Sequence, residues 1–229
     1  MIAGLLLCDH VDEDFQDRFG DYPDMFESLF PEFVWKAYDV TIGEFPKDID
    51  ACDVYFSTGS RHSVYDDIEW IRQLEKFIRL LYKGNKYFIG VCFGHQIIGS
   101  ALGGLVGKST NGWCVGVHQF QIKQEMSWMI PLSEKIQLLM MCQDQILELP
   151  DQSILLATSE MCPNAMIKVG DKFLGIQAHP EYSAEYNEHL MSSRIERMGD
   201  SVVNEGIESL DLSIDSYIFR NWVLQFLAE

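Results

Sequence analysis

The sequence is poor in basic residues. It has 17 lysines and arginines against 35 aspartates and glutamates in 229 residues, which gives a formal net charge of −18. Such a chain repels phosphate backbones, so we expect no nucleic-acid partner. The acidic residues form no long run, and this distribution is typical of an ordinary solvated surface.

Long hydrophobic runs are absent too. No stretch approaches the roughly 18 apolar residues of a membrane-spanning helix, so no membrane partner is expected. The first segment, MIAGLLLCDHVDEDF, has no basic residue before its short apolar run, and the run ends at Asp9. We interpret it as a first buried strand rather than as a signal peptide.

Metal-binding and phosphate-binding motifs are also missing. The six cysteines form no C-x-x-C pair and have no metal-ligand spacing. We expect them to be reduced and buried, which indicates a cytoplasmic protein without a metal. Gly107-Lys108-Ser109 looks like the end of a phosphate-binding loop, but the glycine that this motif requires five residues earlier is Leu102. The sequence therefore predicts no cofactor.

What the sequence does contain is strand-like apolar runs that alternate with helical patterns. Its length and its 47% apolar residues predict one large domain over 1–229, with 183–229 as a helical extension. Expected strands are 2–8, 33–40, 52–58, 86–91, 115–122, 134–141, 152–158, 165–170 and 172–178, and expected helices are 66–84, 95–104, 183–198 and 214–228. This order predicts an α/β fold whose mainly parallel sheet is covered by helices and extended by antiparallel strands.

The last expected helix is amphipathic. Its apolar face comprises Tyr217, Ile218, Trp222 and Phe226. We expect this face to pack on its own domain rather than on a partner.

The stretch GVCFGHQIIGSALGG, residues 90–104, carries the first chemical signal. Cys92 lies between a strand and a helix, and Gly90 and Gly94 flank it at two residues on either side. A nucleophile at such an elbow has a strained backbone whose close neighbours must be glycines. The elbow would put the thiol at a helix N-terminus, which favours the thiolate, and would aim the Phe93 N–H at an oxyanion.

A base for this thiol is found downstream, in FLGIQAHPE. His179 follows an apolar strand, Pro180 ends the strand pairing, and Glu181 can reach back to one imidazole nitrogen. Taken alone, the first motif is also consistent with a buried structural cysteine, and the second with a structural histidine at the end of a strand. Together the two motifs favour a catalytic triad of Cys92, His179 and Glu181.

These motifs resemble the class I, triad-type glutamine amidotransferases, in particular stand-alone domains similar to the GMP synthase glutaminase and related stand-alone γ-glutamyl peptidases. The family pattern G-x-C-x-G-x-Q is met by Gly90, Cys92, Gly94 and Gln96, and its His-Pro-Glu by 179–181. The resemblance implies a flavodoxin-like three-layer fold and attack of a cysteine thiolate on the γ-carboxamide of glutamine. It implies a role in binding glutamine for Gln96.

The resemblance also points to the loop STGSRHSVYDD for the second amide of the oxyanion hole. Thr58 and Gly59 are the candidate donors in this loop, where Thr58 replaces a family glycine and Ser60 a family proline. In CQDQILELP, Cys142 stands where the family often has a histidine. These departures fall where the substrate pocket would lie.

Three functions remain open on these residues. The first is a glutaminase-type amidotransferase that releases ammonia for an acceptor or synthetase subunit, and this hypothesis is ranked first. The alternative is a stand-alone γ-glutamyl peptidase, which the departures at Thr58, Ser60 and Cys142 favour. The third is a binding module without activity, against which the intact triad argues. Turnover of glutamine compared with γ-glutamyl dipeptides distinguishes the first two.

Overall fold

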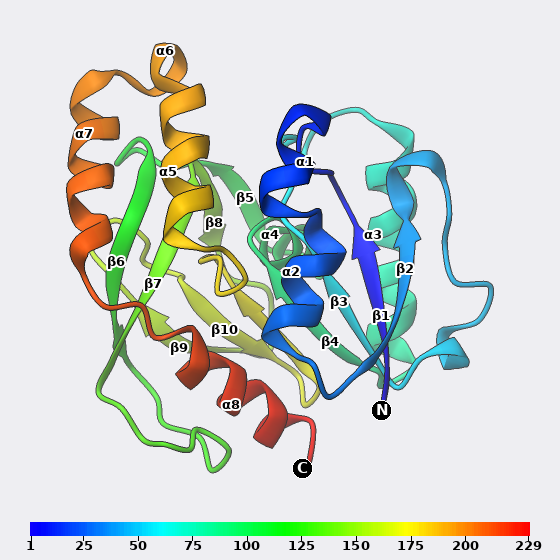
Figure 1. Cartoon of the computed structure of the whole chain (residues 1–229). Coiled ribbons are helices and arrows are strands. Elements are labelled where there is room, and N and C mark those ends of the chain that lie inside the picture. The colour runs from blue at the N-terminus through cyan, green and yellow to red at the C-terminus, as the bar shows by residue number, and fades with distance from the viewer.

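Nine strands form the central sheet of the protein, in the order β2-β1-β3-β4-β11-β10-β9-β6-β7. A computed structural model describes residues 1–229, and helices cover both faces of the sheet (Figure 1). The strands are β1 (Ile2–Leu7), β2 (Val34–Asp39), β3 (Val54–Ser57), β4 (Tyr87–Val91), β6 (Cys114–Ile122), β7 (Lys135–Cys142), β9 (Ser153–Thr158), β10 (Met166–Val169) and β11 (Phe173–Ile176).

The strand pairing changes sense across the sheet. β2, β1, β3, β4 and β11 pair in parallel, and β10, β9, β6 and β7 continue the sheet with antiparallel pairing. The predicted three-layer α/β fold is therefore confirmed. Two further strands, β5 (Leu105–Lys108) and β8 (Asp144–Glu148), pair in a small separate sheet that the sequence did not indicate.

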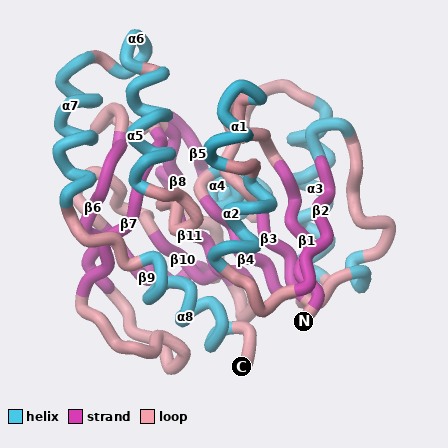
Figure 2. Tube along the Cα trace, viewed as in Figure 1, coloured by secondary structure: helices cyan, strands magenta, loops and turns pink.

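The helices divide between the two faces (Figure 2). One face carries α3 (Glu69–Lys83) and α4 (Phe93–Ala101), which share a hydrophobic cluster. The other carries α1 (Glu13–Phe19), α2 (Tyr22–Leu29), α5 (Ala184–Ser193), α7 (Asp200–Glu208) and α8 (Ser216–Phe226), which contribute to a second, larger cluster. The short α6 (Ile195–Met198) joins α5 to α7.

Local sequence explains where α2 and α3 begin and end. Asp21 caps α2, and its side chain and that of Asp24 form a reciprocal capping box. α3 buries an apolar stripe that includes Leu74 and Ile78, and it ends at Gly84, as the sequence predicts. The capping signal of α2 was present in the sequence, but α1 and α2 were not predicted.

The C-terminal region differs from its prediction. Residues 183–198 are split into α5 and α6, and α7 is an additional helix. α8 packs on its own sheet, as predicted, through Phe219, Trp222 and other buried side chains. Tyr217 was wrongly assigned to this apolar face, because it lies one residue before the buried stripe and is 60% exposed.

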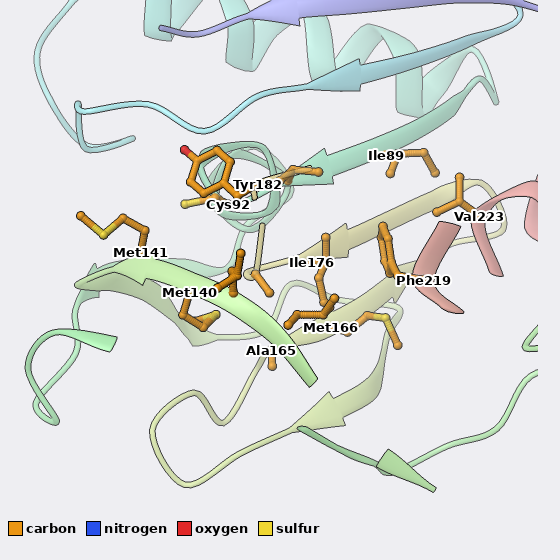
Figure 3. Packing of buried hydrophobic residues seen from close by; sticks show 14 of the residues in the cluster. Ile89, Cys92, Met140, Met141, Ala165, Met166, Ile176, Tyr182, Phe219 and Val223 are labelled. Atoms are coloured by element: carbon orange, nitrogen blue, oxygen red, sulfur yellow. The ribbon is translucent and has the colours of Figure 1, made fainter. Parts of the chain in front are cut away.

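The larger cluster connects α8 with the end of the sheet where Cys92 lies. Figure 3 labels Cys92 and Tyr182 toward one side of this cluster and Phe219 and Val223 of α8 toward the other. All six cysteines are free and buried, as expected. None of the helices is both long enough and apolar enough to cross a membrane.

Candidate active site

Cys92 lies on a strained elbow between β4 and α4. Its backbone has φ 50° and ψ −98°, a conformation that residues other than glycine rarely adopt. The Cys92 N–H donates to the Ile176 carbonyl of β11 at 2.8 Å, which fixes the elbow to the neighbouring strand. A Cβ at Gly90 would collide with the Gly94 carbonyl, and a Cβ at Gly94 would collide with Ser57 Oγ. The elbow therefore requires both glycines.

His179 follows β11, the strand that pairs with β4 in parallel, so both side chains come from the same edge of the sheet. His179 Nδ1 is 2.8 Å from Glu181 Oε1, and both side chains are buried. A Cβ built on Gly59 would lie 3.6 Å from His179 Nε2 and 3.7 Å from Cys92 Cβ. The nucleophile candidate and the base candidate thus approach each other on one side of Gly59.

The electrostatics of this group favour a protonated imidazole. Burial alone would lower the pKa of His179, but the charges of Cys92 and Glu181 and hydrogen bonds to both raise it to about 10. The Tyr182 ring stacks on the imidazole, with centroids 4.0 Å apart and an angle of 9° between the planes. Stacking and the Glu181 contact together fix the orientation of the ring.

Backbone amides next to the thiol could hold an oxyanion. Phe93 is the first residue of α4, so its N–H has no acceptor within the helix. The Thr58 N–H instead donates to the Leu6 carbonyl of β1 at 3.2 Å. Because this bond engages the Thr58 amide, Gly59 is the better donor candidate of the two predicted in this loop.

Two glutamine side chains connect the thiol to the small sheet. Gln96 Nε2 donates to the Asp144 carbonyl at 2.7 Å and to Gln177 Oε1 at 3.3 Å. Gln177 Nε2 in turn lies 3.5 Å from Cys92 Sγ, to which it donates. Gln177 was missed, although a polar residue at the end of the apolar β11 is a signal that could have found it. Gln96 lines the cavity above Cys92, while its amide group also supports Gln177.

The active-site cavity, as we call the space above Cys92, has a volume of about 330 Å³. Its walls come from the loop 60–66, from α4, from the ends of β5 and β7, and from the junction of α5 and α6. The loop is anchored by Arg61, whose N–H donates to Asp9 Oδ2 at 2.7 Å and whose guanidinium pairs with Asp9 and Asp12. The sequence did not predict the wall residues Arg194 and Arg197.

A family model for "Glutamine amidotransferase class-I" matches residues 44–196, which include Cys92, His179 and Glu181. The chain belongs to the class I glutamine amidotransferase family. The predicted resemblance is thereby confirmed.

Several relatives of this chain have names that state an activity. It is 34% identical over 191 residues to gamma-glutamyl peptidase 3 of Arabidopsis thaliana, and the alignment covers 79% of this chain and 76% of that protein. It is 29% identical over 122 residues to a glutamine-hydrolysing GMP synthase of Borreliella burgdorferi, and this alignment covers 52% of this chain and 24% of that protein.

Solved structures agree on the fold. A glutamine amidotransferase from Thermotoga maritima superimposes with a TM-score of 0.81 at 18% identity, over 100% of this chain and 99% of that one. At this level of identity the match concerns the three-layer architecture.

Proposed function

We propose that this protein hydrolyses γ-glutamyl amide bonds through a thioester on Cys92, and that γ-glutamyl peptides are its main substrates. Cys92, His179 and Glu181 act as nucleophile, acid–base group and orienting carboxylate. The geometry that supports these roles is the contact of Glu181 with His179 Nδ1 at 2.8 Å and the approach of His179 to Cys92 beside Gly59.

The first half of the reaction forms the thioester. The Cys92 thiolate attacks the γ-carbonyl carbon, and the carbonyl oxygen becomes an oxyanion that accepts from the amides of Phe93 and Gly59. Each good donor of this kind contributes about 3 kcal/mol to the transition state. The tetrahedral intermediate collapses when the C–N bond breaks, and His179 gives its proton to the leaving amine.

The second half releases glutamate. His179, now neutral, takes a proton from a water molecule that attacks the thioester carbonyl. The C–S bond breaks, Cys92 leaves as the thiolate, and His179 is again protonated. The raised pKa of His179 supports this cycle, because it keeps the imidazole protonated and able to give its proton to the leaving amine.

The extent of the active-site cavity is the observation that favours peptides. Besides Cys92, the cavity is lined by Lys108, Trp113 and the junction of α5 and α6, and its volume of about 330 Å³ has room for a leaving group larger than ammonia. Relatives at 34% identity that are named gamma-glutamyl peptidases point to the same substrates. The sequence motifs alone favour glutamine as the substrate, whereas these two observations favour γ-glutamyl peptides.

Glutamine amidotransfer is the second candidate. The family match and the similarity to a GMP synthase favour it. In this case ammonia from glutamine would pass to an acceptor or synthetase subunit, and glutaminase activity would rise when that partner is added.

The test compares substrates and variants in parallel. Glutamate release is measured from glutamine and from several γ-glutamyl dipeptides, with the wild type, Cys92→Ala and the matched control Cys52→Ala. Cys52 is a second free, buried cysteine, and it does not line the active-site cavity. We expect kcat/KM for the dipeptides to exceed that for glutamine by about tenfold or more.

Loss of both activities in Cys92→Ala, with retention in Cys52→Ala, supports the thioester mechanism. Turnover of glutamine alone would overturn the peptidase proposal in favour of amidotransfer. Absence of Cys92-dependent turnover for every γ-glutamyl substrate would overturn the proposed chemistry altogether.

A further inference from the structure

The far wall of the active-site cavity is basic. Lys108 comes from the end of β5, while Arg194 and Arg197 come from the junction of α5 and α6. Three cations from segments about 86 residues apart in sequence thus line the same cavity as Cys92. None of them belongs to the proposed catalytic triad.

The arginines of this wall have no acidic partner. The chain has seven arginines and carries a net charge of −18, so carboxylates are plentiful. Five of the seven form ion pairs with aspartate or glutamate. The remaining two are Arg194 and Arg197, and both line the active-site cavity. An acidic protein that leaves only these two arginines unpaired presents them to an external anion.

The acidic residues of the same cavity do not neutralise this wall. Asp144 accepts hydrogen bonds from Ser63 Oγ and from the Tyr65 hydroxyl. Asp66 accepts from the Ser63 N–H at 3.0 Å and lies 3.6 Å from His62. Both carboxylates are therefore engaged with the loop 60–66, and no ion pair joins them to the basic wall.

Trp113 gives the wall its shape. The Arg197 guanidinium lies over the Trp113 ring, 5.0 Å from its centroid. Such stacking holds the planar guanidinium in place, and its parallel N–H groups match a carboxylate. Trp113 also offers an apolar surface beside the charges, which suits the side chain of an amino acid.

We propose that Arg194, Arg197 and Lys108 bind the free carboxylate of the amino acid that leaves, so that the preferred substrates are γ-glutamyl amino acids or short peptides with this carboxylate. The inference rests on the proposed hydrolysis of γ-glutamyl peptides and names the part of the substrate that the cavity recognises. Glutamine lacks this carboxylate, because its leaving group is ammonia.

The experiment uses two substrates that differ only in this charge, γ-glutamylalanine and γ-glutamylalanine amide. The measured quantity is the ratio of kcat/KM for the acid to kcat/KM for the amide. We expect the wild type to prefer the acid by about tenfold or more, since charge-assisted hydrogen bonds supply this discrimination even where solvent weakens them. Arg194→Gln, Arg197→Gln and the double variant should lower the ratio toward one.

Matched variants separate charge from structure. Arg197→Lys keeps the charge but loses the planar fork, so it should retain part of the preference. Arg72→Gln removes an arginine of α3 that pairs with Asp67 outside the cavity, and it should leave the ratio unchanged. Arg197 is exposed, so its single replacement tests the proposal even where the double variant does not fold.

A binding measurement distinguishes this inference from the proposed function. Calorimetry on Cys92→Ala compares the affinities for the acid and the amide without turnover. Tighter binding of the acid, lost in Arg197→Gln, supports the carboxylate site even where the wild type cleaves neither compound, a result that overturns the proposed function alone. Equal binding and equal turnover of acid and amide overturn the inference. An equal loss for both compounds in the arginine variants also overturns it, since the cations would then hold the α-carboxylate of the γ-glutamyl group.

Discussion

Replacing Gly59 by alanine tests the pairing of Cys92 and His179 without changing either residue. The added Cβ would lie 2.8 Å from His179 Cε1 and 3.7 Å from Cys92 Cβ. Ordinary contact with a Cβ begins near 3.4 Å, so the imidazole must retreat by the difference of about 0.6 Å. The backbone at Gly59 is not in the left-handed region and accepts alanine without strain.

The displaced ring should slow catalysis much more than it destabilises the fold. A misplacement of about 1 Å in a catalytic group lowers rates by about 100-fold. For the shorter shift we expect kcat/KM to fall by about tenfold to 100-fold, which corresponds to about 1.4–2.7 kcal/mol of transition-state stabilisation. Tyr182 stacks on the ring and opposes its movement.

The assay is kcat/KM for a γ-glutamyl dipeptide, recorded with the melting temperature and with the rate at which iodoacetamide alkylates Cys92. Gly43→Ala is the control, because Gly43 has a φ of 84° and open space around its Cα. That change should lower stability by about 1 kcal/mol and leave the rate intact. Wild-type kcat/KM in Gly59→Ala would refute the proposed position of His179 against the thiol.

Four further predictions follow from the described contacts. Cys92→Ala should remove the covalent γ-glutamyl adduct that mass spectrometry detects in the wild type during turnover, with little change in stability; an adduct that persists would exclude Cys92 as the nucleophile. Glu181→Gln should lower the pKa of His179, so the alkaline limb of the pH–rate profile moves to lower pH and kcat falls by about tenfold or more; an unshifted profile would mean that another group orients the ring. Burial lowers the pKa of His10, but hydrogen bonds to Asp21 and Asp39 raise it overall, so protonated His10 stabilises the fold fully below about pH 6.5 and this contribution is lost as pH rises through the raised pKa. His10→Gln should flatten this part of the curve of unfolding free energy against pH, and an unchanged curve would contradict the assignment. Trp222→Ala should destabilise the protein by about 3–5 kcal/mol in denaturant titration, since the indole is fully buried and donates to a carbonyl at 2.9 Å; a loss below about 1 kcal/mol would contradict its place in the core.

Local spacing explains why the elbow was predictable. Gly90, Cys92 and Gly94 sit within five residues, and the strain at the thiol requires both glycines whatever the rest of the chain does. The contact of His179 with Glu181 spans two residues and was equally readable. The strand and helix order of the parallel half followed from apolar runs for the same reason.

Features that depend on distant residues were not predictable. Whether the amide of Thr58 or of Gly59 is free depends on the pairing of the loop with β1. Arg194 and Arg197 look like ordinary surface residues in the sequence, and only the packing of α5 and α6 beside β5 brings them to the cavity. The position of Gln177 at the end of an apolar strand marks it as unusual, but its contact with the thiol spans 85 residues and appears only when β4 and β11 pair.

The pairing of β4 with β11 has a consequence for the order of folding. The two strands lie side by side in parallel, although 85 residues separate Cys92 from Gln177 and much of the antiparallel half lies between them. Closing so long a loop is slow relative to forming helices and hairpins. Helical signal should therefore return early on refolding from denaturant, while thiol reactivity and turnover return only when β11 docks. The proposed activity would thus report the last step of chain assembly.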